Sequence, residues 1–571
     1  MTSRRRLALL ALPVGFLAVF FAWPVANIIG EGLRGDETWD LSGLRDVLGD
    51  AALRDVVWFT FWQALASTAL TLVLALPAAQ VLARYEFRGR RVVQALVTVP
   101  FVLPTVVVGA AFLALIGPRS PIGVHLDGTI WAILLAHAFF NHAVVVRTVG
   151  GLWEGLDPRT EEAARLLGAS RWRALREVTL PALRPAIASA AAITFLFTFS
   201  SFGIVRILGG AGHATLEVEI YRQTADLLDL PVASVLALLQ LTIVGSLLVV
   251  QDRLERRRAG VAVALSPARR RRPATGLERA WLGANLGVLA LVLLTPLAVL
   301  VERSFRTGDG HGLAAWRALA VRTQASRLFV SPLEAVANSV RFAVAATAVA
   351  VVLGGLAATA LSRLGDARMG AALDGVPLER RHCAHGRLAD RLGSSGGRVA
   401  RGVDAVLLLP LGTSAVTVGF GFLIALDSPV DLRATPWLVP LAQAVVALPF
   451  VVRTMTPVLR SIDDRLREAA ATLGASPARV WREVDLPLVR RAVLVAAGFA
   501  FAISLGEFGA TTVIARADAP TVPVAIDRLL GRPGALNVGQ AFALSVILMV
   551  LTATAVALVD RARPDERGGW V

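Results

Sequence analysis

Apolar residues in this chain fall into runs long enough to cross a lipid bilayer. They make up 55% of the 571 residues, and the mean hydropathy is +0.64. A helix needs about 20 consecutive apolar residues to cross the hydrocarbon core. The pattern predicts an all-α, polytopic membrane protein of about twelve spans. The predicted spans are residues 7–29, 57–83, 92–116, 129–150, 186–208, 231–251, 280–301, 341–362, 403–426, 436–456, 492–515 and 539–560.

A nearly identical phrase occurs twice, far apart in the sequence. The first copy, residues 162–170, reads EAARLLGAS, and the second, residues 468–476, reads EAAATLGAS. Each continues into a similar tail, REVTLP or REVDLP, and then into an apolar run. The chain is therefore a tandem duplication with half of the predicted spans in each copy. An even number of spans per half gives both halves the same orientation, so the repeats are parallel.

The boundary between the halves is rich in arginine and contains Pro267 and Pro273, as is typical of a linker. We predict three parts, which are a first repeat over residues 1–251, a basic linker over 252–276 and a second repeat over 277–571.

The formal net charge of +16 would suit nucleic acid, but the arginines lie in short loops beside the predicted spans. Positive charge in such loops marks the cytoplasmic side of a membrane protein. We therefore expect no nucleic-acid partner, membrane lipid around the spans, and both termini and both copies of the phrase in the cytoplasm. Residues 7–29 lack the small-residue cleavage site of a signal peptide, so we retain them as a span.

The chain contains no lysine, and Cys383 is its single cysteine. A phosphate-binding loop of the G-x-x-x-x-G-K-[ST] type requires lysine, and a disulfide or a multi-cysteine metal site requires more cysteines. We expect no catalytic residue, no metal and no cofactor bound by this chain. If ATP drives transport, another polypeptide hydrolyses it.

Each phrase has the start and stop signals of a short helix. Asp157 and Asp463 precede the two copies and can cap free backbone amides. Gly168 and Gly474 can end the helix, because glycine accepts backbone conformations that other residues avoid.

A second helix should follow at once in each copy. Ser170 and Ser476 can cap it, and Pro181 and Pro487 mark a bend into the next span. We call residues 157–181 and 463–487 the two elbows.

The first helix of each elbow carries the candidate docking residues. Its alanines permit close approach of another surface, and its glutamate offers a fixed charge. Alanine and glutamate are also simply good helix formers, but two copies at the same spacing favour a docking role. The candidates are Glu162, Ala163, Ala164 and Gly168 in the first elbow and Glu468, Ala469, Ala470 and Gly474 in the second.

The pattern E-A-A, three residues, G and a later L-P resembles the signature loop of the membrane subunits of ATP-binding-cassette importers. The resemblance covers both halves and implies the fused, type I permease fold. It implies that the short helices are coupling helices that fit into two cytoplasmic ATP-binding subunits, which use the ATP. It also implies an extracytoplasmic substrate-binding protein and a bacterial inner-membrane location.

The segments SSFG (200–203), LGG (208–210) and TLEVEIY (215–221) are similar to the thiamine permease branch of that family, with the ferric-iron branch close behind. Thiamine is therefore the expected substrate, and ferric iron is the alternative. A secondary transporter driven by an ion gradient is the rival from another class, since it also uses parallel repeats and membrane carboxylates.

Glu507 is the outstanding polar residue within a predicted span. A carboxylate at membrane depth normally faces a cavity or a partner, because an unpaired buried charge costs several kcal/mol. We expect it to contact a cationic substrate. The alternatives are an ion pair with Arg206, a bond to backbone donors, or a hydrated position near the membrane surface.

Aligning the two elbows places Ser201 opposite Glu507 and Phe202 opposite Phe508. Parallel repeats are related by a pseudo-twofold axis along the membrane normal. If equivalent spans face each other across this axis, these residues and Ser200 line one passage. An aromatic pair also serves as simple packing.

Overall fold

The structure is a computed structural model that describes residues 3–33, 49–258, 270–307, 310–322, 328–373, 406–428 and 431–562, with a few isolated positions between them. Within these ranges helices dominate, and the strands form one short hairpin of β1 (Arg306–Thr307) and β2 (Gly310–His311). The predicted all-α fold is confirmed. Residues 259–269 of the predicted linker and Cys383 lie outside the described residues.

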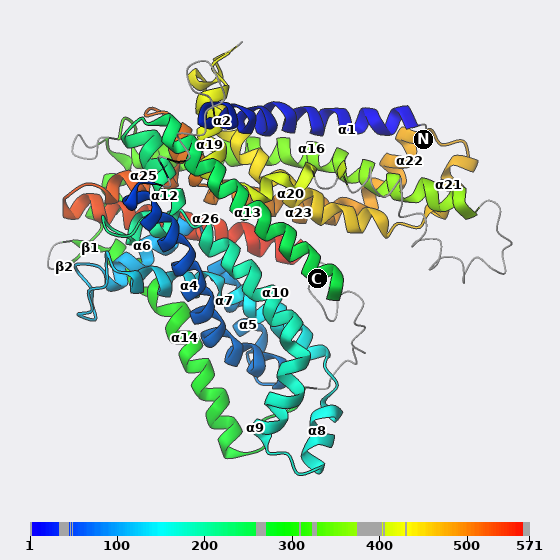
Figure 1. Cartoon of the computed structure of the whole chain (residues 1–571), viewed down its shortest axis with the longest axis horizontal. Helices are drawn as coiled ribbons and strands as arrows, with labels where there is room; N and C mark the ends of the chain where they lie inside the picture. Colours follow the sequence, from blue (N-terminus) through cyan, green and yellow to red (C-terminus); the bar gives the residue numbers. More distant parts are fainter. Residues whose placement is uncertain are drawn as a thin grey trace. The chain divides into compact units, whose positions relative to one another are not determined.

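Figure 1 labels many of the helices. Those of the first repeat are α1 (Ser3–Leu17), η1 (Ala18–Ala22), α2 (Trp23–Leu33), α4 (Ala51–Arg84), α5 (Arg90–Val102), α6 (Thr105–Ile116), α7 (Ile130–Gly155), α8 (Pro158–Leu166), α9 (Arg171–Ala174), η2 (Leu175–Thr179), α10 (Leu180–Phe199), α11 (Gly203–Leu208), α12 (Leu216–Tyr221), η3 (Arg222–Asp226) and α13 (Leu230–Arg258). Those that follow are α14 (Gly276–Ser304), α15 (Ala314–Arg317), η4 (Ala318–Ala320), α16 (Pro332–Leu373), η7 (Leu409–Gly412), α19 (Ala415–Ala425), η8 (Leu432–Ala434), α20 (Leu438–Arg460), α21 (Asp464–Thr472), α22 (Pro477–Val480), η9 (Trp481–Asp485), α23 (Leu486–Gly506), α24 (Gly509–Ile514), α25 (Val522–Leu530) and α26 (Ala535–Ala562).

Ten helical segments among the described residues are long and apolar enough to cross a membrane, and one bent pair brings the number to as many as 11. They coincide with predicted spans. The ninth predicted span, residues 403–426, holds the short turn η7 and the short apolar helix α19 in its described part. The chain is therefore a polytopic helical membrane protein, as expected.

The third predicted span is not one straight helix. It consists of α5 and α6, which meet at an angle of 103°. Leu103, between them, is extended because the ring of the following Pro104 disfavours helical geometry at the residue before it. Pro104 is the N-cap residue of α6, and its carbonyl accepts the N–H groups of Val107 and Val108.

The fifth and eleventh predicted spans are broken as well. The helix α10 ends at Phe199 and α11 begins at Gly203, while α23 ends at Gly506 and α24 begins at Gly509. The two breaks lie at equivalent places in the repeats, within the segments where the sequence suggested a substrate path.

The chain stays helical through Pro181 and Pro487, where the sequence predicts a bend. Residues Arg171–Phe199 and Pro477–Gly506 each run as one helix through the proline. The turn before the proline is a π-helix in both copies. In η2 the N–H of Leu180 donates to the carbonyl of Leu175, and in η9 the N–H of Leu486 donates to the carbonyl of Trp481. Such a turn shifts the hydrogen bonding by one residue, so the helix passes the proline without a break.

The chain forms two compact units that do not coincide with the repeats. The N-unit contains Glu31–Val336 and Ala517–Ala553, and the C-unit contains Met1–Gly30, Ala337–Arg516 and Thr554–Asp565. The first long helix of each repeat thus belongs to the unit built mostly from the other repeat. The predicted boundaries describe the duplication in the sequence, whereas the packing exchanges segments.

Contacts within each unit show this exchange. In the C-unit, Trp23 Nε1 donates to the carbonyl of Ala425 at 3.2 Å, and the rings of Phe20 and Phe422 lie 6.0 Å apart. In the N-unit, α14 packs into the core formed by α4, α5, α6 and α7.

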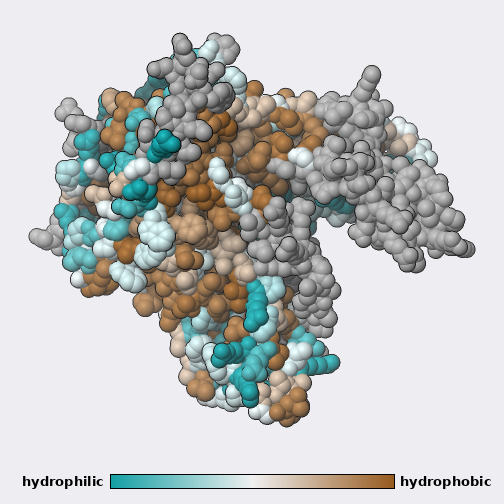
Figure 2. All heavy atoms as spheres, in the orientation of Figure 1, coloured by the Kyte–Doolittle hydropathy of each residue, from teal (hydrophilic) through white to brown (hydrophobic). Residues whose placement is uncertain are grey.

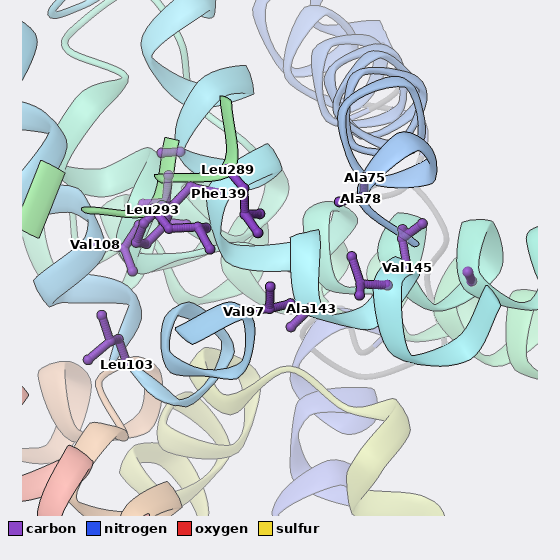
Figure 3. Packing of buried hydrophobic residues seen from close by; sticks show 14 of the residues in the cluster. Ala75, Ala78, Val97, Leu103, Val108, Phe139, Ala143, Val145, Leu289 and Leu293 are labelled. Carbon is purple, nitrogen blue, oxygen red and sulfur yellow. The ribbon is translucent and has the colours of Figure 1, made fainter. Parts of the chain in front are cut away.

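The core of the N-unit is apolar and closely packed. Figure 3 shows Phe139 of α7 beside Val108 of α6, with Leu289 and Leu293 reaching in from α14. Figure 2 shows polar residues gathered over the end of this unit that carries α8 and α9, with apolar residues over the helices next to them. That distribution suits a unit whose middle lies in lipid.

Glycines allow the helix after each break to lie very close to a neighbour. A Cβ atom added to Gly109 would lie 2.9 Å from the side chain of Ile207 in the N-unit. In the C-unit a Cβ on Gly419 would lie 2.7 Å from the backbone oxygen of Ala510. The second neighbour is backbone and cannot rotate away, so α19 requires glycine where it meets α24.

We expect Gly419→Val to force α19 and α24 apart and to destabilise the C-unit by about 1–3 kcal/mol, the usual range for overpacking. Thermal unfolding of the purified protein in detergent would measure the change. Gly245→Val is the matched control, because a Cβ at Gly245 meets nothing within 4 Å. Equal melting temperatures for the two variants would contradict the close contact.

Candidate functional site

Both elbows begin as the sequence predicts. The N–H of Arg159 donates to Asp157 Oδ1 at 3.0 Å, which caps α8. The N–H of Arg465 donates to Asp463 Oδ1 at 3.0 Å and caps α21 in the same way. The two short helices are therefore built by the same local signal.

Both short helices also end by the same device. Gly168 and Gly474 adopt left-handed backbone conformations, with φ of +91° and +83°. Their neighbours leave open space, since an added Cβ would meet nothing within 4 Å. Glycine is required here by the backbone angle rather than by crowding.

The second helix of each elbow is capped by serine, as predicted. The N–H of Arg173 donates to Ser170 Oγ at 3.2 Å, and the N–H of Arg479 donates to Ser476 Oγ at 3.4 Å. The elbow geometry thus repeats at each cap and turn.

The candidate docking residues lie on matching surfaces. Glu162, Ala163 and Gly168 are exposed and Ala164 is half-buried; in the second elbow Glu468, Ala469 and Gly474 are exposed and Ala470 is half-buried. The same face of the short helix is therefore open in both copies.

The structure adds exposed leucines that the sequence reading missed. Leu166 and Leu167 are each 90% exposed, and Leu473 is 88% exposed. Large apolar side chains held almost fully in water at equivalent places are typical of a binding surface. The signal in the sequence is the leucine directly before the turn glycine in each phrase.

Glu507 lies at the break between α23 and α24, and its side chain accepts hydrogen bonds from residues in the first turn of α24. The carboxylate accepts the N–H of Ala510 at 2.7 Å, the N–H of Thr511 at 3.0 Å and the hydroxyl of Thr511. The residue is buried, with 6% of its surface exposed. Among the roles weighed from the sequence, the structure shows the bond to backbone donors. Contact with a cationic substrate stays a prediction.

Arg206 has partners within its own unit, the N-unit, whereas Glu507 belongs to the C-unit. The Nε of Arg206 lies 3.5 Å from Asp527 Oδ1 within the N-unit, and its guanidinium lies over the ring of Tyr221. An ion pair between Glu507 and Arg206 would join the two units, and this alternative stays a prediction.

The equivalent break in the N-unit is polar in a different way. Ser201 Oγ and His137 Nε2 share a hydrogen bond of 2.8 Å, and His137 Nδ1 shares another of 3.0 Å with Ser67 Oγ. All three residues are buried. This chain of hydrogen bonds joins the break to α7 and α4, and the sequence reading did not anticipate it.

The remaining path candidates lie at the same breaks. Ser200 Oγ donates to the carbonyl of Leu196 at 2.8 Å, and the rings of Phe202 and Tyr221 lie 5.5 Å apart. Phe508 is buried in the C-unit. The prediction that Ser201 and Glu507 line one passage stays a prediction, as does the pairing of their neighbours.

Among the described residues no three His, Cys, Asp or Glu side chains are grouped so that they could hold a metal ion. The chemistry at the breaks is that of hydrogen bonds and aromatic packing. The elbows and the broken spans are the two features that a function must use.

Comparison with known proteins agrees with this geometry. The profile of the family described as binding-protein-dependent transport system inner membrane component matches residues 71–260 and 388–567. Each match contains one elbow.

Several curated proteins are similar over most of the chain. The thiamine transport system permease protein ThiP of Escherichia coli (strain K12) is 28% identical over 498 residues, which are 84% of this chain and 84% of that protein. ThiP of Brucella abortus (strain 2308) is 28% identical over 542 residues, which are 91% of this chain and 90% of that protein. The sulfate transport system permease protein CysT of Escherichia coli (strain K12) is 37% identical over 145 residues, 24% of this chain and 52% of that protein.

The family profile covers both repeats and more than half of the chain. The chain therefore belongs to the family of binding-protein-dependent transport system inner membrane components.

Proposed function

We propose that this protein is the permease subunit of an ATP-binding-cassette importer for thiamine. The observation that carries the proposal is the pair of elbows, which repeat the same caps, turn and exposed leucine. Support for thiamine as the substrate comes from the ThiP relatives, which are similar over 84% and 91% of this chain.

In this proposal each elbow docks onto one cytoplasmic ATP-binding subunit. Leu167 and Leu473 supply apolar contact, and the exposed alanines allow the short helix to lie close against the partner. A single exposed leucine is common on protein surfaces. Two leucines at equivalent sites, each ahead of a left-handed glycine, favour a pair of similar partner sites.

The ATP-binding subunits supply the chemistry, because this chain has no lysine for a phosphate-binding loop. A substrate-binding protein delivers thiamine on the opposite side of the membrane. With the elbows in the cytoplasm, both chain termini lie there as well. ATP binding and hydrolysis in the partners move the elbows, and the attached spans change access to the path.

The breaks after α10 and α23 are the proposed substrate path. Each break ends a span that begins at an elbow, so movement at the elbow reaches the break directly. Ser200, Ser201 and Phe202 contribute from one unit, and Glu507 and Phe508 contribute from the other. Glu507 shapes the path by fixing the start of α24.

Combined replacement of Gly168 and Gly474 by valine should abolish association with the ATP-binding subunits. A side chain with a Cβ costs about 1–2 kcal/mol in the left-handed conformation, so each elbow would refold away from its docking shape. Co-purification with the ATP-binding subunits measures the loss. The control is Gly151→Val, where an added Cβ meets nothing and no positive φ is required. Retained uptake without any ATP-binding subunit would favour the ion-driven transporter instead.

Deletion of this chain should remove uptake of labelled thiamine supplied at nanomolar concentration. Cells with and without the chain would be compared at constant iron supply, with excess unlabelled thiamine as competitor. Unchanged thiamine uptake, together with reduced uptake of ferric iron, would move the substrate to iron and leave the permease role intact.

Glu507→Gln should lower the melting temperature of the purified protein and reduce uptake in parallel. The glutamine amide retains one acceptor oxygen, but its NH₂ group would face a site that already contains three hydrogen-bond donors. A buried polar group left without a partner costs about 1–3 kcal/mol. Glu483→Gln is the control, since its ion pair with Arg479 is exposed. A normal melting temperature with lost uptake would instead support direct contact with the cation.

A further inference from the structure

A side chain on each elbow helix is joined to the start of the span that follows. In the N-unit, Thr179 Oγ1 donates to Glu161 Oε2 at 3.1 Å, across 18 residues of sequence. In the C-unit, Arg467 Nε donates to Asp485 Oδ1 at 2.8 Å, also across 18 residues. Thr179 and Asp485 are the last residues of the π-turns η2 and η9. We call each contact an elbow tie.

The two elbow ties use opposite chemistry at the same positions. The elbow helix contributes an acid, Glu161, in the N-unit and a base, Arg467, in the C-unit. The span contributes the hydroxyl donor of Thr179 in the N-unit and the carboxylate of Asp485 in the C-unit. The contact is present in both copies although the charge of the elbow-helix residue is reversed. The connection between elbow helix and span therefore matters more than the sign of that charge.

Each elbow tie also reaches the end of another long helix. Arg84, the last residue of α4, donates to both carboxylate oxygens of Glu161. Arg467 donates through a second nitrogen to the carbonyl of Leu459 near the end of α20, at 3.4 Å. The elbow helix is thus fixed to two helices rather than to one.

The tie residues lie on the inner face of the elbow helix. The side chain of Asp485 is fully buried, and those of Arg467 and Glu161 are 14% and 16% exposed. The next residue in each elbow, Glu162 or Glu468, is exposed. One face of the short helix is therefore held by its own chain, and the other is open to a partner.

We infer that the elbow ties are the rigid link that turns displacement of the elbow helix into displacement of the span. The role is that of positioning residues for import, and it rests on the proposed function. The turn between the elbow helices contains a left-handed glycine and is held by local backbone hydrogen bonds, with nothing within 4 Å of the place that a Cβ on this glycine would take. The tie bypasses that turn and joins the docking helix to the continuous helix that leads to the break.

The test uses the double variant R467A/D485A, which removes the tie without leaving a buried charge unpaired. R465A is the control, an exposed arginine on the same helix. Both would be purified with the ATP-binding subunits and placed in vesicles with the thiamine-loaded binding protein. We expect the R467A/D485A variant to assemble normally with the ATP-binding subunits. In that complex these subunits should hydrolyse ATP at the basal rate. Import should fall at least tenfold, and the loaded binding protein should no longer stimulate hydrolysis.

A second variant, T179V, tests the other tie with nearly unchanged side-chain shape. It removes the hydroxyl donor and leaves Arg84 on Glu161, so we expect a smaller loss of import for each ATP hydrolysed. Import and stimulation equal to those of R465A in both variants would overturn the inference. Loss of assembly in both would also overturn it, because the contact would then only shape the docking surface. Failure of the wild-type complex to import thiamine would instead refute the proposed substrate.

Discussion

Inside a bilayer every backbone N–H and C=O must find its partner within the protein, and this constraint governs where the spans can break. At the break after α23, the Glu507 carboxylate takes up the free amides at the start of α24. At the break after α10, the carbonyl of Ser201 accepts the hydroxyl of Thr215. At both breaks, side chains therefore replace helical hydrogen bonds that the backbone no longer makes.

The two repeats keep their backbone and vary their side chains. The elbows share caps, turn and π-turn, yet the tie is acidic on one elbow helix and basic on the other. The breaks share their place in the span, yet one holds a serine joined to histidine and the other a carboxylate. The side chains of a duplicated fold can differ between the repeats wherever another chemical group makes an equivalent contact. The two breaks thus differ in chemistry although they lie at equivalent places in the repeats.

Much of the fold could be predicted from local sequence signals. Asp157, Gly168 and Ser170 each act on the backbone within a few residues, so the elbow follows from them directly. The exchange of first helices between units could not be predicted. An apolar run shows that a helix lies in the membrane but does not show which other helix packs against it. The π-turns before the two prolines could not be predicted for a related reason. The shift in their hydrogen bonding is visible only in the folded helix. The charge of Glu507 within an apolar run marks it as unusual in the sequence. Its partners are backbone N–H groups, which the sequence does not distinguish from any others.

The exchanged packing of the N-terminal helix has a consequence for biogenesis. Trp23 bonds to Ala425, a residue 402 positions later in the chain. At about 5–20 residues per second, synthesis of that interval takes roughly 20–80 s. During this time the first span sits in the membrane without its final neighbour. The end of α2 can meet α13 earlier, since a Cβ on Gly32 would lie 3.1 Å from the side chains of Ser234 and Leu238. The C-unit closes around the rest of this helix only late in translation.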